Sequence, residues 1–246
     1  MSDRVPTGIK GFDSLVQGGF PQGSIILLTG PPGSGKTIFA LQFLFNGVTK
    51  YKENGIFLSL EMQKEDVYTQ ASQFGWDLKA LGKKLPVAFV GDEYKLTGEN
   101  IINPLIKDIE KLNAKRVVLD SMSSYLDFYL PEMIESKPSL AKAGASVAIR
   151  YTAAQTLSRL KKTGATILII AEAGTEENQL SRDGVSEYLS DGVVQLHYLG
   201  IGSKEFVNLQ VRKMRFTDYT GGLFPMSISS KGININSEGK RDFLLQ

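Results

Sequence analysis

The chain has 246 residues, a formal net charge of +2 and 42% hydrophobic residues, which is typical of one large or two small globular domains. This small net charge gives no reason to expect nucleic acid or an anionic membrane as a partner. The absence of cysteine excludes disulfides and thiolate metal sites, and the single histidine, His197, cannot build a histidine-based metal site. No signal peptide and no run of about 18 apolar residues is visible, so we expect a cytoplasmic protein without a membrane span.

The first predicted elements surround a glycine-rich segment. Residues 25–29 are a short apolar run typical of a buried strand, and apolar residues at helical spacing follow from 38 to 48. Between them the chain matches the phosphate-loop pattern G-x-x-x-x-G-K-[ST], with the residues Gly30, Pro31, Pro32, Gly33, Ser34, Gly35, Lys36 and Thr37. In such a loop the backbone N–H groups bind the phosphates of ATP, Lys36 assists at the β- and γ-phosphates, and Thr37 supplies a hydroxyl for Mg²⁺.

The next predicted strand, residues 55–60, is followed directly by Glu61. Ligands of open α/β sheets gather at the carboxyl ends of the strands, so Glu61 is a candidate general base for ATP hydrolysis. A carboxylate that interacts with the N-terminus of the next helix, predicted over 66–74, fits the pattern equally well.

A second acidic residue follows a later strand. After a predicted strand at 86–90 and a helix at 102–112 with a one-face apolar stripe, residues 116–120 form an apolar run that ends in Asp120. This is the pattern of a Walker B motif, whose aspartate holds Mg²⁺ through water. Together with the phosphate loop it predicts Asp120 and Thr37 as the metal site; the alternative is an ordinary strand-end cap.

Two long segments, residues 121–146 and 172–190, are predicted as loops on either side of a helix at 147–160 and a strand at 165–171. The first contains Pro131, Pro138 and Gly144. Loops of this length in a compact domain are usually functional or mobile.

The pattern changes from residue 191 onward. Three apolar segments, 193–198, 206–211 and 223–229, are separated by short polar or glycine turns, which predicts an antiparallel extension of the sheet. The alternation of strands and helices before them predicts an α/β fold with a central, mostly parallel twisted sheet and helices on both faces. We therefore expect one domain over 1–246, with a lead-in segment (1–23), a nucleotide-binding core (24–190) and C-terminal strands (191–246).

Several segments resemble the KaiC-type ATPase domain of the RecA/RadA superfamily of P-loop proteins. They are residues 7–13, 18–23, 57–61, 74–78, 120–121, 190–194 and 213–215, and the resemblance extends over about residues 5 to 236. The resemblance implies a RecA-like fold, Mg²⁺-dependent ATP hydrolysis and a catalytic role for Glu61.

The resemblance also implies that one chain holds only part of the site. Lys213 and Arg215 would reach the nucleotide of a neighbouring subunit, where a cation stabilises the charge of the transition state. Met214, Thr217 and Tyr219 would line the nucleotide across the same interface. Without the resemblance, a solvated strand face is the favoured interpretation of Lys213 and Arg215.

Trans residues require an oligomer. The family forms rings of six with ATP between subunits, so a homohexamer is expected, although a head-to-tail interface can also open into a filament. The chain departs from the family in carrying Met62 after Glu61, where many members have a second glutamate. It also has one such domain, where the circadian-clock protein has two.

Three functions remain open at this point: a ring-forming ATPase with a regulatory or conformational role, a RecA/RadA-like DNA-binding recombinase or repair ATPase, and an autokinase. Residues 172–191 contain six acidic residues and one basic residue, and 121–146 are also slightly acidic despite the aromatic residues Tyr125, Phe128 and Tyr129. Channels for single-stranded DNA are expected to be basic, so DNA binding ranks second. Nothing in the sequence separates an autokinase from simple hydrolysis, and an unknown protein partner stays open.

Overall fold

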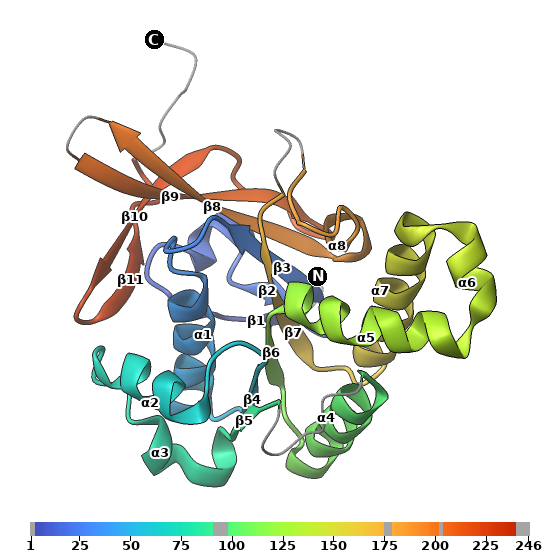
Figure 1. Ribbon diagram of the computed structural model, residues 1–246. Helices are drawn as coiled ribbons and strands as arrows, with labels where there is room; N and C mark the ends of the chain where they lie inside the picture. The colour runs from blue at the N-terminus through green and yellow to red at the C-terminus, as the bar shows by residue number, and fades with distance from the viewer. Residues whose placement is uncertain (1–2, 91–97, 175–178, 202–203, 240–246) are drawn as a thin grey trace.

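A mixed sheet of nine strands forms the centre of the molecule, in the order β11-β10-β9-β8-β3-β7-β6-β4-β5 (Figure 1). The computed structural model describes residues 3–90, 98–174, 179–201 and 204–239. The strands from β8 to β5 run parallel to one another, and β9, β10 and β11 extend the sheet in antiparallel fashion. The strands are β3 (Ile25–Gly30), β4 (Gly55–Ser59), β5 (Val87–Phe89), β6 (Arg116–Asp120), β7 (Thr166–Glu172), β8 (Gly192–Ile201), β9 (Lys204–Met214), β10 (Leu223–Ser229) and β11 (Gly232–Ile235).

Helices cover both faces of this sheet, as Figure 1 shows. Successive side chains of a strand point to opposite faces. In β3, Ile26 and Leu28 accordingly belong to one hydrophobic cluster, while Ile25 and Leu27 belong to the other. The helices are α1 (Lys36–Tyr51), α2 (Lys64–Ser72) and α3 (Leu78–Leu81) on one side, α4 (Gly98–Leu112), α5 (Met122–Ser136), α6 (Pro138–Ala143) and α7 (Ala145–Lys161) on the other, and α8 (Ser186–Leu189) beside β8.

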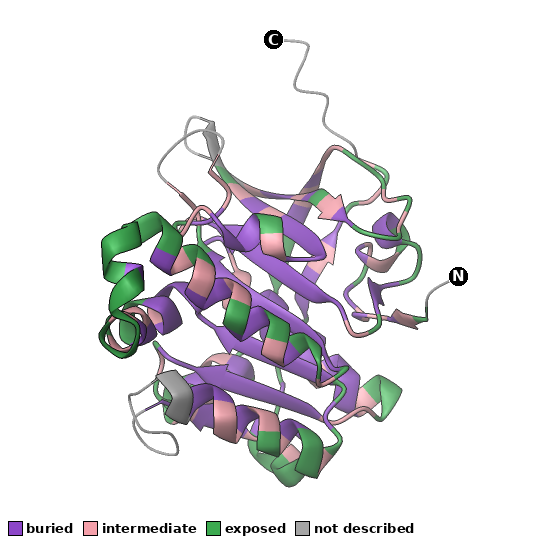
Figure 2. Cartoon of the chain, turned by 90° about the vertical axis from the view of Figure 1, so that its right-hand side faces the viewer, coloured by how far each residue is buried: buried purple, intermediate pink, exposed green. Residues whose placement is uncertain are grey.

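The central strands are buried because both layers of helices exclude water from them (Figure 2). Every residue of β3, β4 and β6 is buried. This is the reason why these strands read as continuous apolar runs in the sequence instead of alternating patterns. The predicted α/β fold, with its mostly parallel sheet and antiparallel C-terminal extension, is confirmed.

The segment before the phosphate loop packs against α1. Its short strands β1 (Arg4–Val5) and β2 (Phe20–Pro21) pair with each other, and the 3-10 helix η1 (Asp13–Val16) lies between them in sequence. Phe12 makes an edge-to-face contact with Phe39 of α1, at 5.3 Å between ring centroids. The segment thereby closes the apolar face of the first helix after the loop.

Most predicted elements occur with small shifts in their ends. The helices predicted at 66–74, 102–112 and 147–160 correspond to α2, α4 and α7, and each helix begins two to four residues earlier than predicted. The strand predicted at 86–90 is shorter, and β11 was not predicted. Among the described residues, no helix combines the length and apolar composition that crossing a membrane requires.

The prediction of a loop over 121–146 was wrong, because α5, α6 and the start of α7 occupy it. Pro131 lies inside α5, and Pro138 stands at the first position of α6, where its missing N–H is harmless. The prolines and Gly144 favour a loop in the sequence, but buried side chains recur at helical spacing through α5, at Met122, Tyr125, Leu126, Tyr129 and Met133. Two of the three aromatic side chains considered as DNA platforms, Tyr125 and Tyr129, are therefore in the core.

The second predicted loop, 172–190, is shorter than expected. Strand β7 continues to Glu172, and α8 forms over residues 186–189. Glu176 and Glu177, two of its acidic residues, lie outside the described residues.

Candidate functional site

The glycine-rich loop joins the end of β3 to the start of α1. Gly35 has φ 95°, and a Cβ at this position would lie 2.8 Å from Cδ1 of Ile228, so only glycine fits without movement. The Lys36 ammonium folds back over the loop and donates to the carbonyl oxygens of Gly30 and Pro31, at 2.8 and 2.9 Å. The loop thus holds the Lys36 ammonium on two of its own backbone carbonyl oxygens.

Thr37 and Asp120 lie in direct contact. The Thr37 hydroxyl donates to Oδ2 of Asp120 at 2.9 Å. Burial raises the pKa of Asp120 to about 6, and the hydrogen bond from Thr37 acts in the opposite direction. Burial also lowers the pKa of Lys36, against the attraction of Asp120 and two further carboxylates. A buried carboxylate that is costly to ionise, next to a hydroxyl, is a donor set that suits a hard cation such as Mg²⁺.

Glu61 lies just after β4, and its contacts are with the N-terminus of α5. Its Oε1 accepts hydrogen bonds from the hydroxyls of Ser121 and Ser124, the latter at 2.8 Å. Ser121 is the N-cap residue of α5 and accepts from the backbone N–H of Ser124 at 3.2 Å. The carboxylate is solvent-exposed and lies before α2, so the helix end that it contacts is that of α5 and not that of the following helix.

Parallel pairing brings these groups to one edge of the sheet. Ser59 of β4 pairs with Asp120 of β6, and Gly30 of β3 pairs with Glu172 of β7. The carboxyl ends of four strands therefore meet there, as in other open α/β sheets. Glu172 itself is paired with Arg182 at 3.2 Å.

A hollow of about 180 Å³ lies beside the loop. It is lined by Gly33, Gly35, Lys36, Thr37, Ile38 and Gln70. The predicted loop residues and one side chain from α2 therefore share one open space.

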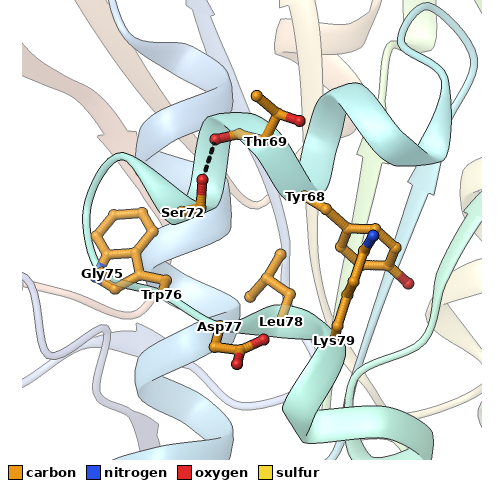
Figure 3. A pocket seen from close by; sticks show the side chains of 8 residues that line it. All are labelled: Tyr68, Thr69, Ser72, Gly75, Trp76, Asp77, Leu78 and Lys79. Carbon is orange, nitrogen blue, oxygen red and sulfur yellow. Dashed lines mark hydrogen bonds between the residues drawn. The ribbon is translucent and has the colours of Figure 1, made fainter.

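A larger hollow of about 420 Å³ lies between α2 and α3, away from the loop (Figure 3). Trp76 on its wall stacks on Phe74 at 4.8 Å, and Lys79 is paired with Glu65 at 2.6 Å while lying over the Tyr68 ring. The Lys79 charge on its wall is already paired within the chain, and none of the loop residues line this hollow.

The residues predicted to act in trans lie at the other edge of the same sheet. Met214 of β9 pairs with Gly192 of β8, and Gly192 pairs with Ile26 near the start of β3. The phosphate loop begins at Gly30, at the far end of that strand. Within one chain the structure does not bring residues 213–215 to the loop.

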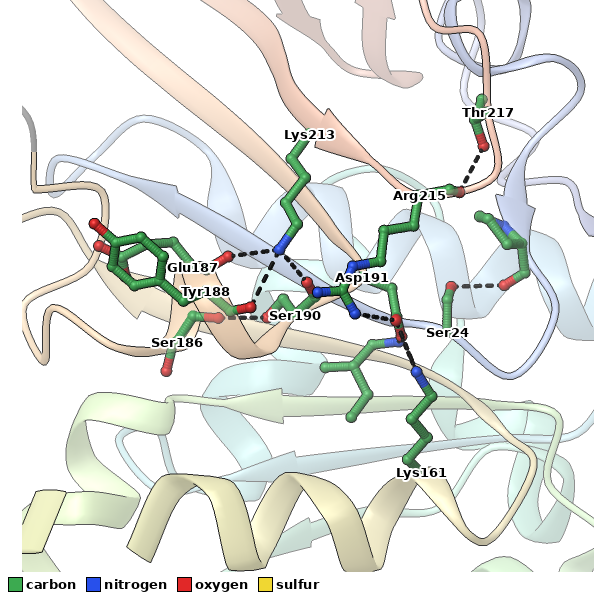
Figure 4. Close-up of polar contacts among 12 residues, drawn as sticks. Ser24, Lys161, Ser186, Glu187, Tyr188, Ser190, Asp191, Lys213, Arg215 and Thr217 are labelled. Atoms are coloured by element: carbon green, nitrogen blue, oxygen red, sulfur yellow. Dashed lines mark hydrogen bonds and ion pairs between the residues drawn. The ribbon is translucent and has the colours of Figure 1, made fainter. Parts of the chain in front are cut away.

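The Lys213 ammonium is tied to its own chain (Figure 4). It donates to the carbonyl oxygens of Glu187, Tyr188 and Ser190, at 3.1, 3.2 and 2.6 Å. These oxygens belong to the end of α8 and the residue that follows it, so Lys213 caps this short helix. Burial lowers the pKa of Lys213, and the nearby charge of Arg215 adds to this effect.

The Arg215 guanidinium is held more loosely. Its Nη1 lies 3.5 Å from Oδ1 of Asp191, and half of the side chain, 49%, is exposed. Asp191 is buried and has closer partners, because Lys161 contacts both of its oxygens at 2.7 and 2.8 Å and Ile25 donates its backbone N–H at 2.9 Å (Figure 4). The Asp191 carboxylate is thus neutralised mainly by Lys161.

The other three predicted interface residues also have partners within the chain. Met214 is buried. Thr217 accepts from Arg4 at 2.7 Å, and the Tyr219 hydroxyl donates to the Arg212 carbonyl at 3.1 Å. All three lie near β9 and away from the phosphate loop.

No group of three or more histidine, aspartate or glutamate side chains lies close enough to hold a metal ion in the part of the chain that the structure describes. His197 contacts Gln210 at 3.1 Å, and burial lowers its pKa. This contact joins β8 to β9 within the sheet.

The chain is similar to known proteins over most of its length. The family model described as "ATPase: KaiC" matches residues 5–240. The chain belongs to the KaiC ATPase family. The circadian clock oscillator protein KaiC of Parathermosynechococcus lividus is 35% identical over 238 residues, which cover 93% of this chain and 41% of that protein. The same-named protein of Synechococcus elongatus is 32% identical over 241 residues, which cover 94% and 44%. This KaiC-family chain therefore spans less than half the length of these relatives.

A solved structure shares the fold over nearly the whole chain. The crystal structure of a KaiC-like protein from the hyperthermophilic archaeon Pyrococcus horikoshii has a TM-score of 0.80 and 30% sequence identity, covering 96% of this chain and 99% of that one. The RecA-like architecture expected from the resemblance is thereby confirmed for this KaiC-family chain.

Sequence reasoning missed three polar side chains at the loop edge of this KaiC-family chain. Ser124 could have been found from its spacing to Ser121, since a serine three residues after a strand-end serine is a common feature of a helix N-terminus. The position of Glu172 beside the loop depends on the order of the strands in the sheet, which cannot be read from the sequence. Gln70 lies in a helix with no motif, and only its position in space connects it to the loop.

Proposed function

We propose that this chain binds Mg²⁺ and ATP at its phosphate loop and hydrolyses ATP at sites shared between neighbouring copies in a ring. The turnover would be slow and would drive a regulatory or conformational change. Family membership and the loop geometry support the ATPase. One observation supports the shared site: the two sets of predicted residues lie at opposite edges of a single sheet.

The spacing of residues and strands in the sheet gives the distance between the two sets of residues. From Ile26, level with Met214, to Gly30 the chain advances four residues, which is about 13 Å along an extended strand. Two strand-to-strand steps add about 10 Å in the perpendicular direction. Lys213 and Arg215 are therefore out of reach of their own loop, and only a second copy stacked head to tail brings the two edges together.

The residues at the loop edge have complementary parts in this proposal. The loop N–H groups and Lys36 bind the phosphates once these oxygens replace the carbonyls that Lys36 contacts. Thr37 and Asp120 hold Mg²⁺, which would neutralise developing phosphate charge. Because these two residues supply few ligands, phosphate oxygens and water would supply the remaining ones. Glu61 orients and deprotonates the attacking water, with its carboxylate aligned by Ser121 and Ser124.

The contacts at the opposite edge distinguish Arg215 from Lys213. Lys213 uses its donors on three carbonyls at the end of α8, so moving it would leave these oxygens without a partner. Arg215 has one long ion pair, and its partner Asp191 keeps Lys161 when Arg215 leaves. We assign Arg215 as the residue that reaches the neighbour's γ-phosphate, and Lys213 as the residue that fixes α8 beneath it.

The structure gives less support to DNA binding. Arg182, the single base in 172–191, is paired with Asp127 at 2.9 Å and with Glu172 at 3.2 Å. Tyr125 and Tyr129 are in the core, where no base can stack on them. No contact of the described residues favours an autokinase over simple hydrolysis.

Steady-state ATP turnover and molar mass, measured by light scattering with and without Mg²⁺ and nucleotide, test the proposal. We expect turnover to require Mg²⁺ and to rise with ring formation. Lys36→Ala should lose nucleotide binding and reduce turnover about a hundredfold or more, since it removes a cation from the transferring phosphate. Lys111→Ala, an exposed lysine in the last turn of α4, is the matched control.

The same assay with single- and double-stranded DNA at stated salt separates the first two functions. Turnover that DNA leaves unchanged supports the regulatory ATPase. Strong stimulation would make the DNA-dependent motor the better description. Nucleotide binding and turnover that survive Lys36→Ala would contradict the assignment of the loop.

A further inference from the structure

Among the described residues that line the loop hollow, Gln70 alone comes from outside the loop and α1. It lies in the last turn of α2 and lines the 180 Å³ hollow together with loop and α1 residues. Its Oε1 is buried and has no hydrogen-bond partner. Buried polar atoms in folded proteins nearly always have a partner, so this oxygen points to a group that completes the hollow.

The neighbouring polar side chains of α2 behave differently. Thr69 donates to the carbonyl of Glu65 at 2.8 Å, and Ser72 donates to the carbonyl of Thr69 at 2.7 Å (Figure 3). Both line the hollow between α2 and α3, away from the phosphate loop. Gln70 is thus the polar residue of this turn that lines the loop hollow and carries a buried acceptor without a partner.

The chemistry of that acceptor limits what it can bind. Phosphate oxygens are acceptors, so the triphosphate offers no hydrogen for Oε1 of Gln70. A nucleoside does, through the amino group of a base or a ribose hydroxyl. The amino group of adenine lies beside a ring nitrogen, and a carboxamide matches this pair with one acceptor and one donor, as glutamine and asparagine do when they read adenine in DNA.

We propose that Gln70 recognises the nucleoside of the bound nucleotide, with its carboxamide on the amino group and adjacent ring nitrogen of adenine. This inference rests on the proposed ATP site at the loop. Lys36 and Thr37 then bind the phosphate end and read no base, while Gln70 on α2 supplies preference for adenine. Helix α2 begins five residues after the end of β4, so the same segment that presents Glu61 also presents the base-reading residue.

The contact between Gln70 and adenine is tested by changing the side chain and the nucleotide, separately and together. Dissociation constants of the full chain are measured by titration calorimetry with Mg²⁺ for ATP, for purine riboside triphosphate, which lacks the amino group, and for 2′-deoxy ATP. The wild type should bind purine riboside triphosphate about fivefold more weakly than ATP, which corresponds to one hydrogen bond. Gln70→Met should remove this difference, and Thr69→Val, in the same turn but facing the other hollow, should keep it.

The outcomes separate the two proposals. If the wild type binds and turns over ATP but Gln70→Met leaves the ratio between ATP and purine riboside triphosphate unchanged, the inference on Gln70 is wrong and the ATP site stands. If Gln70→Met instead removes a difference between ATP and 2′-deoxy ATP, the side chain reads the ribose and the adenine assignment is wrong. If the wild type does not bind ATP, the proposed function itself fails. An unchanged melting temperature of Gln70→Met shows that the variant folds.

Discussion

The two edges of the central sheet differ in how far their charges are satisfied within one chain. At the loop edge, Asp120 is buried beside a hydroxyl and Lys36 rests on two backbone carbonyls of its own loop. At the opposite edge, Lys213 caps a helix and Asp191 is neutralised by Lys161. Among the described residues, no ion pair joins Lys36 or Asp120 to an opposite charge, whereas Asp191 at the second edge has ion pairs with both Lys161 and Arg215.

This difference explains how one strand can serve two sites. Strand β3 begins beside Asp191, whose carboxylate accepts the backbone N–H of Ile25, and ends at the phosphate loop. A rigid, fully buried strand fixes the distance between the two edges. In the proposed ring this distance would set how each copy presents Arg215 to the loop of the next.

Arg215→Ala should have the largest effect. Removing a cation that acts on the transition state from a neighbouring subunit lowers turnover by about a thousandfold. Lys213→Met should keep most turnover per assembled ring but lower the free energy of unfolding by about 1–2 kcal/mol, because three carbonyls lose a charged donor. Steady-state kinetics and denaturant unfolding of both variants separate the roles. Equal losses of turnover with unchanged stability would show that Lys213 also reaches the nucleotide.

Glu61→Gln should affect hydrolysis and spare binding. The amide keeps the size of the side chain and its contacts with Ser121 and Ser124, but it cannot accept the proton of water, so turnover falls about a hundredfold. Titration calorimetry should give an unchanged affinity for ATP. Glu65→Gln, on the exposed side of α2, is the matched control. Unchanged turnover in Glu61→Gln would move the general base to another residue.

Asp120→Asn tests the electrostatics of the loop edge through the stability of the protein. The pKa of Asp120 is raised from 3.8 to about 6, so the folded state disfavours its ionised form and loses stability as the pH rises toward 6. Without nucleotide and Mg²⁺, the stability advantage of the asparagine variant should therefore grow by about 1 kcal/mol between pH 5 and pH 7.5, then level off. Denaturant unfolding across this range measures it. An equal pH dependence of the free energy of unfolding in the wild type and the variant would contradict a buried Asp120 with a raised pKa.

The strands and the helix at the loop edge could be predicted from the sequence because their signals are local. A buried strand, glycines at fixed spacing and a lysine at the start of a helix form one continuous segment, and the Asp120 strand carries its own apolar run. Parallel pairing then brings these carboxyl ends together without further information. The mistaken loop over 121–146 arose because Pro131 and Gly144 were given more weight than the apolar spacing of α5.

The opposite edge could be predicted only in part. Lys213 caps α8 only because this four-residue helix folds onto the end of β9. Arg215 is loosely held because Asp191 has closer contacts with Lys161. These are contacts between residues 23 to 30 positions apart in sequence, with no motif of their own. Gln70 was missed for the same reason.

A mixing experiment tests most directly whether the site is built from two chains. Arg215→Ala and Glu61→Gln proteins, each nearly inactive alone, are dissociated, combined in equal amounts and reassembled with Mg²⁺ and ATP. In randomly mixed rings, about a quarter of the interfaces join a chain with an intact Glu61 to a neighbour with an intact Arg215. We predict that turnover recovers to about a quarter of the wild-type rate. Turnover no higher than that of the separate variants would contradict a site shared between the two edges of the sheet.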